Sequence, residues 1–331
     1  MAELSARLAM DFNAIVPNAP ATWTNNRLHF FKYMSESTAK KVLENRTLRW
    51  STAATLNDPF ELQLQVSIDS IDIENVKREA LTNIWRLYSG NVPIPAANPL
   101  GVMLEILRIY SPGLSKEELF QELGDGIGES LEVIKNNTPK NREEVMGVLS
   151  SIKILSLTIA PDIGLMWSHY ANSHRGVVMR FRSIPAFDSP FGMARPIKYS
   201  GVRPSFFTES YLINSLSGLQ SVNVKEINDA VIYTKMAEWE YEKEWRISSG
   251  SGRNKEEPFE DVPFGYNELD GLIFGLRTSK EDRQEITKLA AAYPNIEFME
   301  AIPNQVAGRV DVERIQTQPN AATAVCQFGS S

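Results

Sequence analysis

Short runs rich in aromatic and β-branched residues mark the β-strands that this sequence predicts. They lie at residues 28–33 (LHFFKY), 47–51 (TLRWS), 154–158 (ILSLT), 176–181 (GVVMRF), 196–200 (PIKYS), 245–248 (WRIS), 271–274 (GLIF), 296–301 (IEFMEA) and 306–315. Helix signals are interleaved with them along the chain. We therefore expect one sheet system, assembled from segments that are far apart in sequence.

Between residues 71 and 152 the apolar positions take on the spacing of an amphipathic helix. Two apolar stripes follow this spacing. The first consists of Ile73, Val76, Ala80, Ile84 and Leu87, and the second of Met103, Leu107 and Tyr110. The change of period at both boundaries predicts a helical layer outside the sheet.

Polar residues indicate where the helices of this layer begin. Ser115 with Glu118, and Asn141 with Glu144, have the spacing of a capping box, so a helix is expected to begin at each pair. The three glycines of segment 124–128 interrupt the helical pattern and predict a turn.

Three more helices are expected in the rest of the chain. Ser35 is a suitable N-cap for a helix that ends near residue 44. Segment 224–231 has helical spacing, and Ser279 with Asp282 caps a helix that must end before Pro294. The resulting fold class is α+β, with a mixed, split β-sheet core and an inserted helical layer.

The domain organisation follows from these patterns. We expect an N-terminal arm at 1–25, a single α+β domain at 26–316 with its helical insertion at about 71–152, and a flexible tail at 317–331. Within the arm, apolar residues recur at the spacing of a short amphipathic helix, at Leu4, Leu8, Phe12 and Ile15.

Composition narrows the function classes. The 331 residues carry 34 basic and 41 acidic side chains, a formal net charge of −7, which is unfavourable for bulk binding of polyanions. A single cysteine, Cys326, excludes an intramolecular disulfide. No apolar run approaches a membrane span and no signal peptide is evident, so a cytoplasmic protein is expected.

The common catalytic and nucleotide-binding fingerprints are absent from the sequence. It contains no GxGxxG that opens a helix, no GxxxxGK[ST] phosphate loop and no GxSxG elbow. Among the three histidines, His169 and His174 are five residues apart, which would place them on different faces of a helix. We therefore expect no metal site on that pair.

Three segments combine ionisable groups with large aromatic residues: 56–61 (LNDPFE), 166–171 (MWSHYA) and 239–246 (WEYEKEWR). Half-buried ionisable groups are concentrated at functional sites. A purely structural interpretation also stands for each segment. Asp58 would cap a turn anchored in the core by Phe60, Trp167 and Tyr170 would be core residues, and the Glu/Lys run would be a solvated helix end.

These motifs occur in an order that is similar to a bacterial family known only as a domain of unknown function. The ordered set is FFKY, LENRTLRWSTAATLNDPFE, ILSLT, MWSHYANSHRGVVMRF, KMAEWEYEKEWRI and GLIFGLRTSKEDR. The resemblance covers about Leu28 to Pro303 outside the helical insertion. Its layout in turn looks like the ADP-ribosyltransferase fold, an analogy at the level of the fold.

That analogy implies an enzyme that uses NAD as a substrate and transfers ADP-ribose to a macromolecule, protein or nucleic acid, as a toxin or phage-defence effector. Its catalytic residues here would be Glu244, His169 and Tyr170. Glu244 stands at the entry to a strand, where that fold places its carboxylate, and an extended segment would put Glu242 and Arg246 on the same face.

The analogy also implies contacts to NAD from the early strands and from β-strand 245–248. The expected residues are Tyr33, Arg49, Ser51 and Arg246. ADP-ribosyltransferases have a three-residue catalytic motif, and for its first position this sequence leaves His29, Lys32 and Tyr33 as alternatives. Supporting or structural roles are expected for Asn57, Asp58, Glu61, Trp167 and Glu242.

Two other function classes remain open from the sequence. In the first, a metal-dependent hydrolase or nuclease would hold an activated water with Asp58, Glu61, Glu244 and His169. In the second, the polar and aromatic segments would form a non-catalytic module for a ligand or a partner, and Glu244 with Arg246 would be a structural ion pair. The leading interpretation needs no metal, and it leaves the target and the oligomeric state open.

Overall fold

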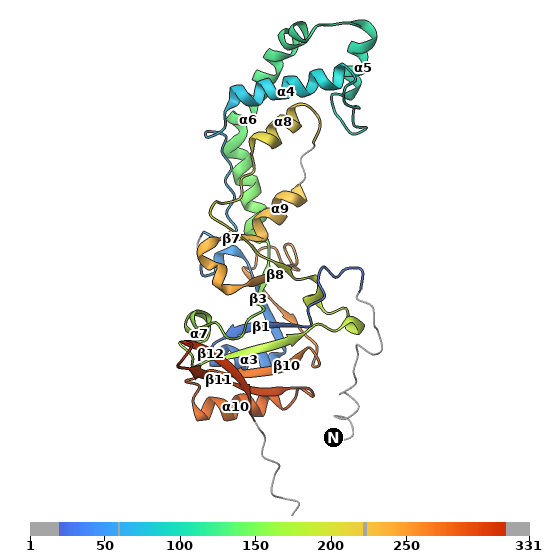
Figure 1. Ribbon diagram of the computed structural model, residues 1–331. Helices are drawn as coiled ribbons and strands as arrows, with labels where there is room; N and C mark the ends of the chain where they lie inside the picture. Colours follow the sequence, from blue (N-terminus) through green and yellow to red (C-terminus); the bar gives the residue numbers. More distant parts are fainter. Residues whose placement is uncertain (1–19, 59, 221–223, 316–331) are drawn as a thin grey trace, which may run out of the picture.

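The computed structural model describes residues 20–58, 60–220 and 224–315 (Figure 1). Most of the N-terminal arm, including its apolar positions 4–15, and the tail at 317–331 lie outside these residues. Within them, none of the helices has the length and apolar character needed to cross a membrane.

The centre of the molecule is a mixed ten-stranded sheet. Its main path runs β12-β11-β10-β4-β1-β3-β2-β9, and β8 joins β3 to β5. The strands are β1 (His29–Met34), β2 (Thr47–Ser51), β3 (Ile154–Thr158), β4 (Val177–Arg182), β5 (Arg195–Pro196), β8 (Glu244–Ser248), β9 (Phe259–Pro263), β10 (Leu269–Phe274), β11 (Glu297–Asn304) and β12 (Arg309–Arg314). The prediction of one sheet system from distant segments is confirmed. β10 and β11 pair in parallel and the other pairs are antiparallel, which makes the sheet mixed.

The sheet is nearly interrupted on either side of β3. A single register pair, Phe31 with Thr158, joins β1 to β3, and another, Ser51 with Ile154, joins β2 to β3. By contrast, β1 and β4 share six register pairs. The strands therefore diverge beside β3 and leave room for side chains between them.

The segment predicted as one strand at 196–200 contributes to two sheets. Arg195 and Pro196 pair with β8, whereas β6 (Lys198–Ser200) pairs in parallel with β7 (Thr234–Met236) in a separate two-stranded sheet. The backbone changes sheets at Ile197, whose N–H donates to the Glu244 carbonyl at 3.0 Å.

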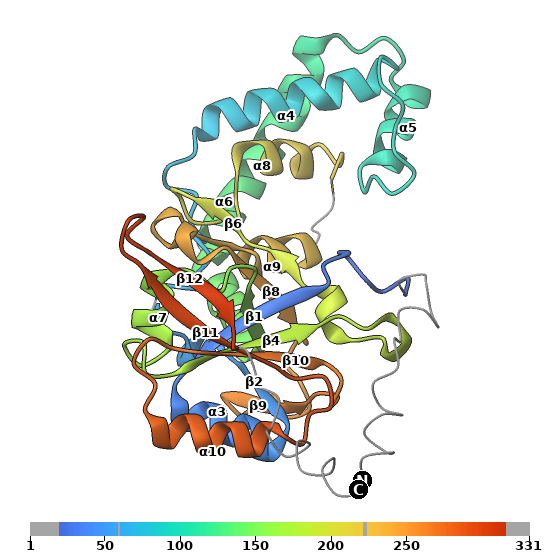
Figure 2. The same cartoon turned by 60° about the horizontal axis from the view of Figure 1, so that its bottom comes forward.

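Helices cover both faces of the sheet and extend from one end (Figures 1 and 2). The α-helices are α3 (Glu36–Asn45), α4 (Ile73–Tyr88), α5 (Gly101–Tyr110), α6 (Lys116–Ser151), α7 (Gly164–Tyr170), α8 (Glu209–Leu216), α9 (Val224–Ile232) and α10 (Lys280–Ala290). α3 and α10 pack together under one face, and α7 covers part of the other. α8 was not expected from the sequence, and with α9 it joins α4, α5 and α6 in the helical layer.

Three predicted helix starts are confirmed by their hydrogen bonds. The hydroxyl of Ser35 accepts the N–H of Thr38 at 3.2 Å, and that of Ser279 accepts the N–H of Asp282 at 3.0 Å. Ser115 and Glu118 form the complete capping box. These polar residues satisfy backbone groups that the first turn leaves without a helical partner.

Two predicted breaks inside the helical layer are wrong. The glycines of 124–128 do not form a turn, and no helix begins at Asn141, because α6 is one continuous helix of 36 residues. The buried side chains Leu119, Ile127 and Leu131 follow one another at helical spacing, so their packing holds the glycine segment in the helix.

Candidate functional site

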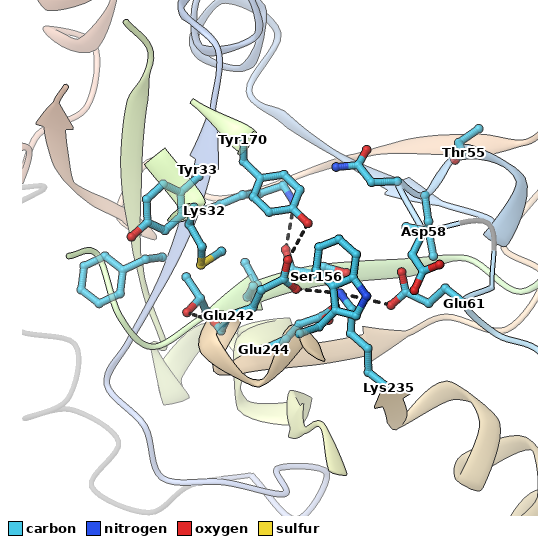
Figure 3. A pocket seen from close by; sticks show the side chains of 17 residues that line it. Lys32, Tyr33, Thr55, Asp58, Glu61, Ser156, Tyr170, Lys235, Glu242 and Glu244 are labelled. Carbon is cyan, nitrogen blue, oxygen red and sulfur yellow. Dashed lines mark hydrogen bonds and ion pairs between the residues drawn. The ribbon is translucent and has the colours of Figure 1, made fainter. Parts of the chain in front are cut away.

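A cavity of about 180 Å³ lies where β1 and β3 diverge (Figure 3). Its walls come from β1, β3, the start of β8, α7, segment 55–61, and a 3₁₀-helix at Ala237–Glu242. Carboxylates, ammonium groups and aromatic rings share the lining, which includes Lys32, Tyr33, Asp58, Glu61, Tyr170, Lys235, Trp239, Glu242 and Glu244. The divergence of the sheet thus brings together all three polar-aromatic segments of the sequence.

Lys235 lies at the centre of the carboxylates. Its Nζ is 2.6 Å from Glu242, 3.0 Å from Glu244 and 3.4 Å from Glu61, and all four side chains are buried. Burial acts to lower the pKa of Lys235, but Glu244 and Glu242 outweigh it and raise that pKa. The lysine therefore remains a cation that compensates the charge of its neighbours.

Arg246 is the second buried cation of this network. Its Nε donates to Glu244 Oε1 at 2.7 Å and its Nη2 to Oε2 at 3.0 Å, while Nη1 donates to the Ile232 carbonyl at 2.8 Å. It also forms an ion pair with Glu61. Because alternate residues of a strand face the same side, β8 presents Glu244 and Arg246 together. Burial raises the pKa of Glu244, and Lys235 opposes that effect.

Glu242 reaches the network by a different route from the one expected. It ends the 3₁₀-helix, and Lys243 then adopts a left-handed conformation with φ of 47°, so residues 242–246 are not one extended segment. Glu242 Oε1 accepts the Tyr170 hydroxyl at 2.6 Å, and Oε2 accepts Lys235. Burial, with added effects of Glu242, raises the pKa of Tyr170, which therefore stays a neutral donor.

Lys32 enters the cavity from β1 on the opposite side. Its Nζ donates to the Ser156 carbonyl of β3 at 2.8 Å and so spans the gap between the diverging strands. Burial lowers the pKa of Lys32 to about 8, although Glu244 acts to raise it. An ammonium has three donors, and that of Lys32 has a single protein acceptor within hydrogen-bond distance in the described structure.

The aromatic residues of the site have different roles. The Tyr33 hydroxyl donates to the Ala160 carbonyl at 2.9 Å and accepts the N–H of Ile163, so only its ring faces the cavity. Trp167 is fully buried behind Tyr33 and donates to the Pro161 carbonyl at 2.9 Å. Trp167 is therefore a core residue that fixes Tyr33 and α7.

The turn at 56–61 positions polar groups, but without the expected aromatic anchor. Asp58 Oδ1 accepts the N–H of Phe60 at 2.8 Å, as expected for a capped turn. The Phe60 side chain, however, is 60% exposed. Leu62 and Leu64 fill the apolar core beside this turn, which leaves Phe60 on the surface under the guanidinium of Arg203.

Five expected site residues do not line the cavity. Trp167 and Arg246 are fully buried, and the other three are Arg49, Ser51 and His169. Arg49 forms a two-bond ion pair with Asp261 on the exposed side of β2, and Ser51 is likewise absent from the lining. His169 is exposed and contacts the Tyr241 hydroxyl through Nδ1 at 3.3 Å. Adjacent residues of α7 point about 100° apart, so Tyr170 faces inward while His169 faces outward.

Sequence reasoning missed the residue at the centre of the site. Lys235 lies nine positions before Glu244, in a short strand with no distinguishing pattern. Its only signal was its place at the start of the motif KMAEWEYEKEWRI, which also carries both glutamates. Trp239, the first residue of segment 239–246, is not among the expected site residues, yet it lines the cavity with Lys235 Nζ 4.9 Å from its ring centre.

The fold and this site define a mixed α+β protein with a buried charged network at the junction of its sheet. Residues 166–247 match a family described as a protein of unknown function (DUF2971). This span contains residues 166–170 of α7, together with Lys235, Glu242, Glu244 and Arg246. No curated protein and no solved structure matches the chain. Among the described residues, no group of three or more His, Cys, Asp or Glu side chains is arranged to hold a metal ion.

Proposed function

We propose that this protein is an enzyme of the ADP-ribosyltransferase type, which cleaves NAD between ribose and nicotinamide and transfers ADP-ribose to a macromolecule. The observation that carries the proposal is the position of Glu242 and Glu244 in an aromatic-lined cavity where the sheet divides. The ADP-ribosyltransferase-like arrangement of the sheet is part of the same proposal.

The two glutamates have different surroundings, and this difference assigns their roles. Glu244 binds both Arg246 and Lys235, whereas Glu242 binds one cation and the neutral hydroxyl of Tyr170. A carboxylate with fewer cationic partners interacts more strongly with a new positive charge. We therefore assign Glu242 to the reacting ribose and Glu244 to positioning Lys235 and Arg246. This proposal exchanges the roles expected from the sequence, in which Glu244 is the catalytic carboxylate and Glu242 has a supporting role.

The cavity contains the groups that this reaction needs: a carboxylate, aromatic rings and an ammonium. As the bond from ribose C1′ to nicotinamide breaks, nicotinamide leaves with the electron pair and positive charge develops on the ribose, where a carboxylate in a water-poor site stabilises it. An oxygen or nitrogen of the acceptor then bonds to C1′ and gives up its proton to a carboxylate or to water. The rings of Tyr170 and Trp239 are suited to contact a planar base, and the Lys32 ammonium to bind a phosphate oxygen.

The metal-dependent alternative has less support from the geometry. The ammonium of Lys235 occupies the position between Glu61, Glu242 and Glu244 that a cation shared by these carboxylates would take. His169, the expected nitrogen ligand, faces away from them. A non-catalytic ligand-binding role remains an outcome of the test below.

The test is incubation with NAD and chromatographic measurement of free nicotinamide. We expect the wild-type protein to release nicotinamide and Glu242→Gln to lose about 100-fold in rate, as when a charge-stabilising group is removed. Glu240→Gln is the matched control, because Glu240 is exposed and lies two residues earlier. Full activity of a folded Glu242→Gln would contradict the assignment, and NAD binding without release would indicate a binding module.

A further inference from the structure

A trough leads from the site toward the helical layer. The site cavity shares Asp58, Glu61 and Lys235 with a second, narrow cavity of about 20 Å³. This second cavity shares Gln63 and Arg203 with a third, of about 220 Å³. The three cavities are therefore neighbours, and together they form the trough beside the carboxylates of the site.

The backbone of the trough is held in place by two segments that run side by side. The N–H of Gln65 donates to the Pro204 carbonyl at 2.9 Å, and the N–H of Phe206 donates to the Gln65 carbonyl at 2.9 Å. A parallel bridge also pairs Gln65 with Ser205. These contacts fix Arg203 next to Gln63, at the junction of the second and third cavities.

Two arginines from distant elements converge on the third cavity. Arg142 comes from α6, and Arg203 precedes α8. Both are exposed, and neither has a carboxylate at ion-pair distance within the described ranges 20–58, 60–220 and 224–315. The chain as a whole has a net charge of −7, but these two guanidinium groups, which lack a carboxylate partner among the described residues, make the third cavity locally cationic. They can bind phosphate oxygens in pairs.

An exposed aromatic ring lies between these arginines and the site. Phe60 lines the second cavity and is 60% exposed, and the guanidinium carbon of Arg203 lies 4.9 Å from its ring centre. Such a ring offers a flat surface on which an unpaired base can stack. Gln63 and Gln65, farther along the trough, carry amides that can hydrogen-bond base edges.

We infer that this trough binds single-stranded nucleic acid and that the strand is the acceptor of the proposed reaction; the acceptor role rests on the proposed function. The arginines would bind phosphates, and Phe60 would stack a base beside the carboxylates. A duplex would leave the ring unused, because its bases are already stacked. In the transfer, a base ring nitrogen that carries a hydrogen atom forms a bond to C1′ as the bond from C1′ to nicotinamide breaks. Nicotinamide leaves with the electron pair, and the proton of the ring nitrogen passes to a carboxylate or to water.

The test measures binding of labelled DNA and RNA oligonucleotides by fluorescence anisotropy, without NAD, at several salt concentrations. For Arg142→Ala and Arg203→Ala, the slope of log affinity against log salt should fall by about 0.7 each, the value for one phosphate contact on a single strand. Phe60→Ala should weaken binding about fivefold or more with the slope unchanged. Lys280→Ala on α10, an exposed lysine at the opposite end of the molecule, is the control and should change neither.

Three results would overturn the inference: no oligonucleotide binding at low salt, binding that these three substitutions leave unchanged, or selective binding of an acidic peptide. Nicotinamide release by the wild-type protein is measured separately, without oligonucleotide. Release without oligonucleotide binding would contradict this inference alone. Binding without release would contradict the proposed function and leave a nucleic-acid-binding trough.

Discussion

At the scale of single residues, the site is organised by compensation of buried charge. Lys235 and Arg246 together contact Glu61, Glu242 and Glu244, and each carboxylate has at least one cationic partner. Loss of Glu244 would remove the two-bond carboxylate partner of the fully buried Arg246 guanidinium and one of the carboxylates beside Lys235. We therefore expect Glu244→Gln to destabilise the fold by about 3–5 kcal/mol in urea unfolding. A fully stable Glu244→Gln would show that the network is not structural.

Lys32 gives a prediction with a defined pH range. Burial lowers its pKa in the folded protein from the ordinary 10.5 to about 8. Between these values the unfolded chain binds the proton more strongly, so this residue makes the free energy of unfolding rise with pH. Relative to Lys32→Met, the wild-type protein should become more stable from about pH 8 toward pH 10.5, measured by urea unfolding.

The control for this prediction is Lys41→Met, which removes an exposed lysine from α3. It should show a stability difference from wild type that varies little over the same pH range. A constant difference between Lys32→Met and wild type would show that the Lys32 ammonium is not destabilised by burial.

At the scale of elements, α6 carries a stability prediction. Gly126 lies in its interior and is exposed, and a Cβ added there would have no atom within 4 Å apart from its chain neighbours and the adjacent backbone of the helix. Gly126→Ala should therefore stabilise the protein by about 0.5–1 kcal/mol, because alanine loses less backbone entropy than glycine in a helix. Thermal or urea unfolding measures the change.

Gly176→Ala is the matched variant for which we expect the opposite effect on stability. A Cβ there would lie 2.1 Å from the Met34 carbonyl oxygen, at the close approach of β4 to the end of β1. This substitution should destabilise the protein. If Gly126→Ala were the destabilising one, α6 would not be continuous through its glycines.

The predictable parts of the fold are those in which the local pattern and the tertiary packing agree. Caps such as Ser35 and Ser279 have local partners, so spacing identifies them. The glycines near Gly126 were misassigned because burial of Leu119 and Ile127 outweighs their poor helix propensity. In the site, the motifs marked which segments meet, but not the direction in which each side chain points.

At the scale of the whole molecule, the apolar cores are separate. Two clusters cover the two faces of the sheet, and a third fills the helical layer and part of its junction with β3. A cluster with its own buried side chains can open without the rest. The helical layer and the sheet are therefore expected to differ in local stability.

Leu104→Ala tests this separation. Leu104 is fully buried in the helical layer, and its truncation should cost about 2–5 kcal/mol. Amides of α4 and α6 should exchange hydrogen faster, while those of β4 and β10 keep their protection. Met179→Ala, in the core under the sheet, is the reciprocal variant. Equal acceleration everywhere in Leu104→Ala would mean that the molecule unfolds as one unit.

The single register pair between β1 and β3 makes the sheet mechanically compliant beside the cavity. Six register pairs hold β1 to β4 and five hold β3 to β8, so strain applied to the sheet is relieved more readily at this seam, and at the similar one between β2 and β3, than within those pairs. At the seam between β1 and β3, the hydrogen bond from the Lys32 ammonium to the Ser156 carbonyl links the two strands, and it can break and form again. We therefore expect a ligand that takes the donors of Lys32 to loosen the seam as well and so to widen the space that it enters.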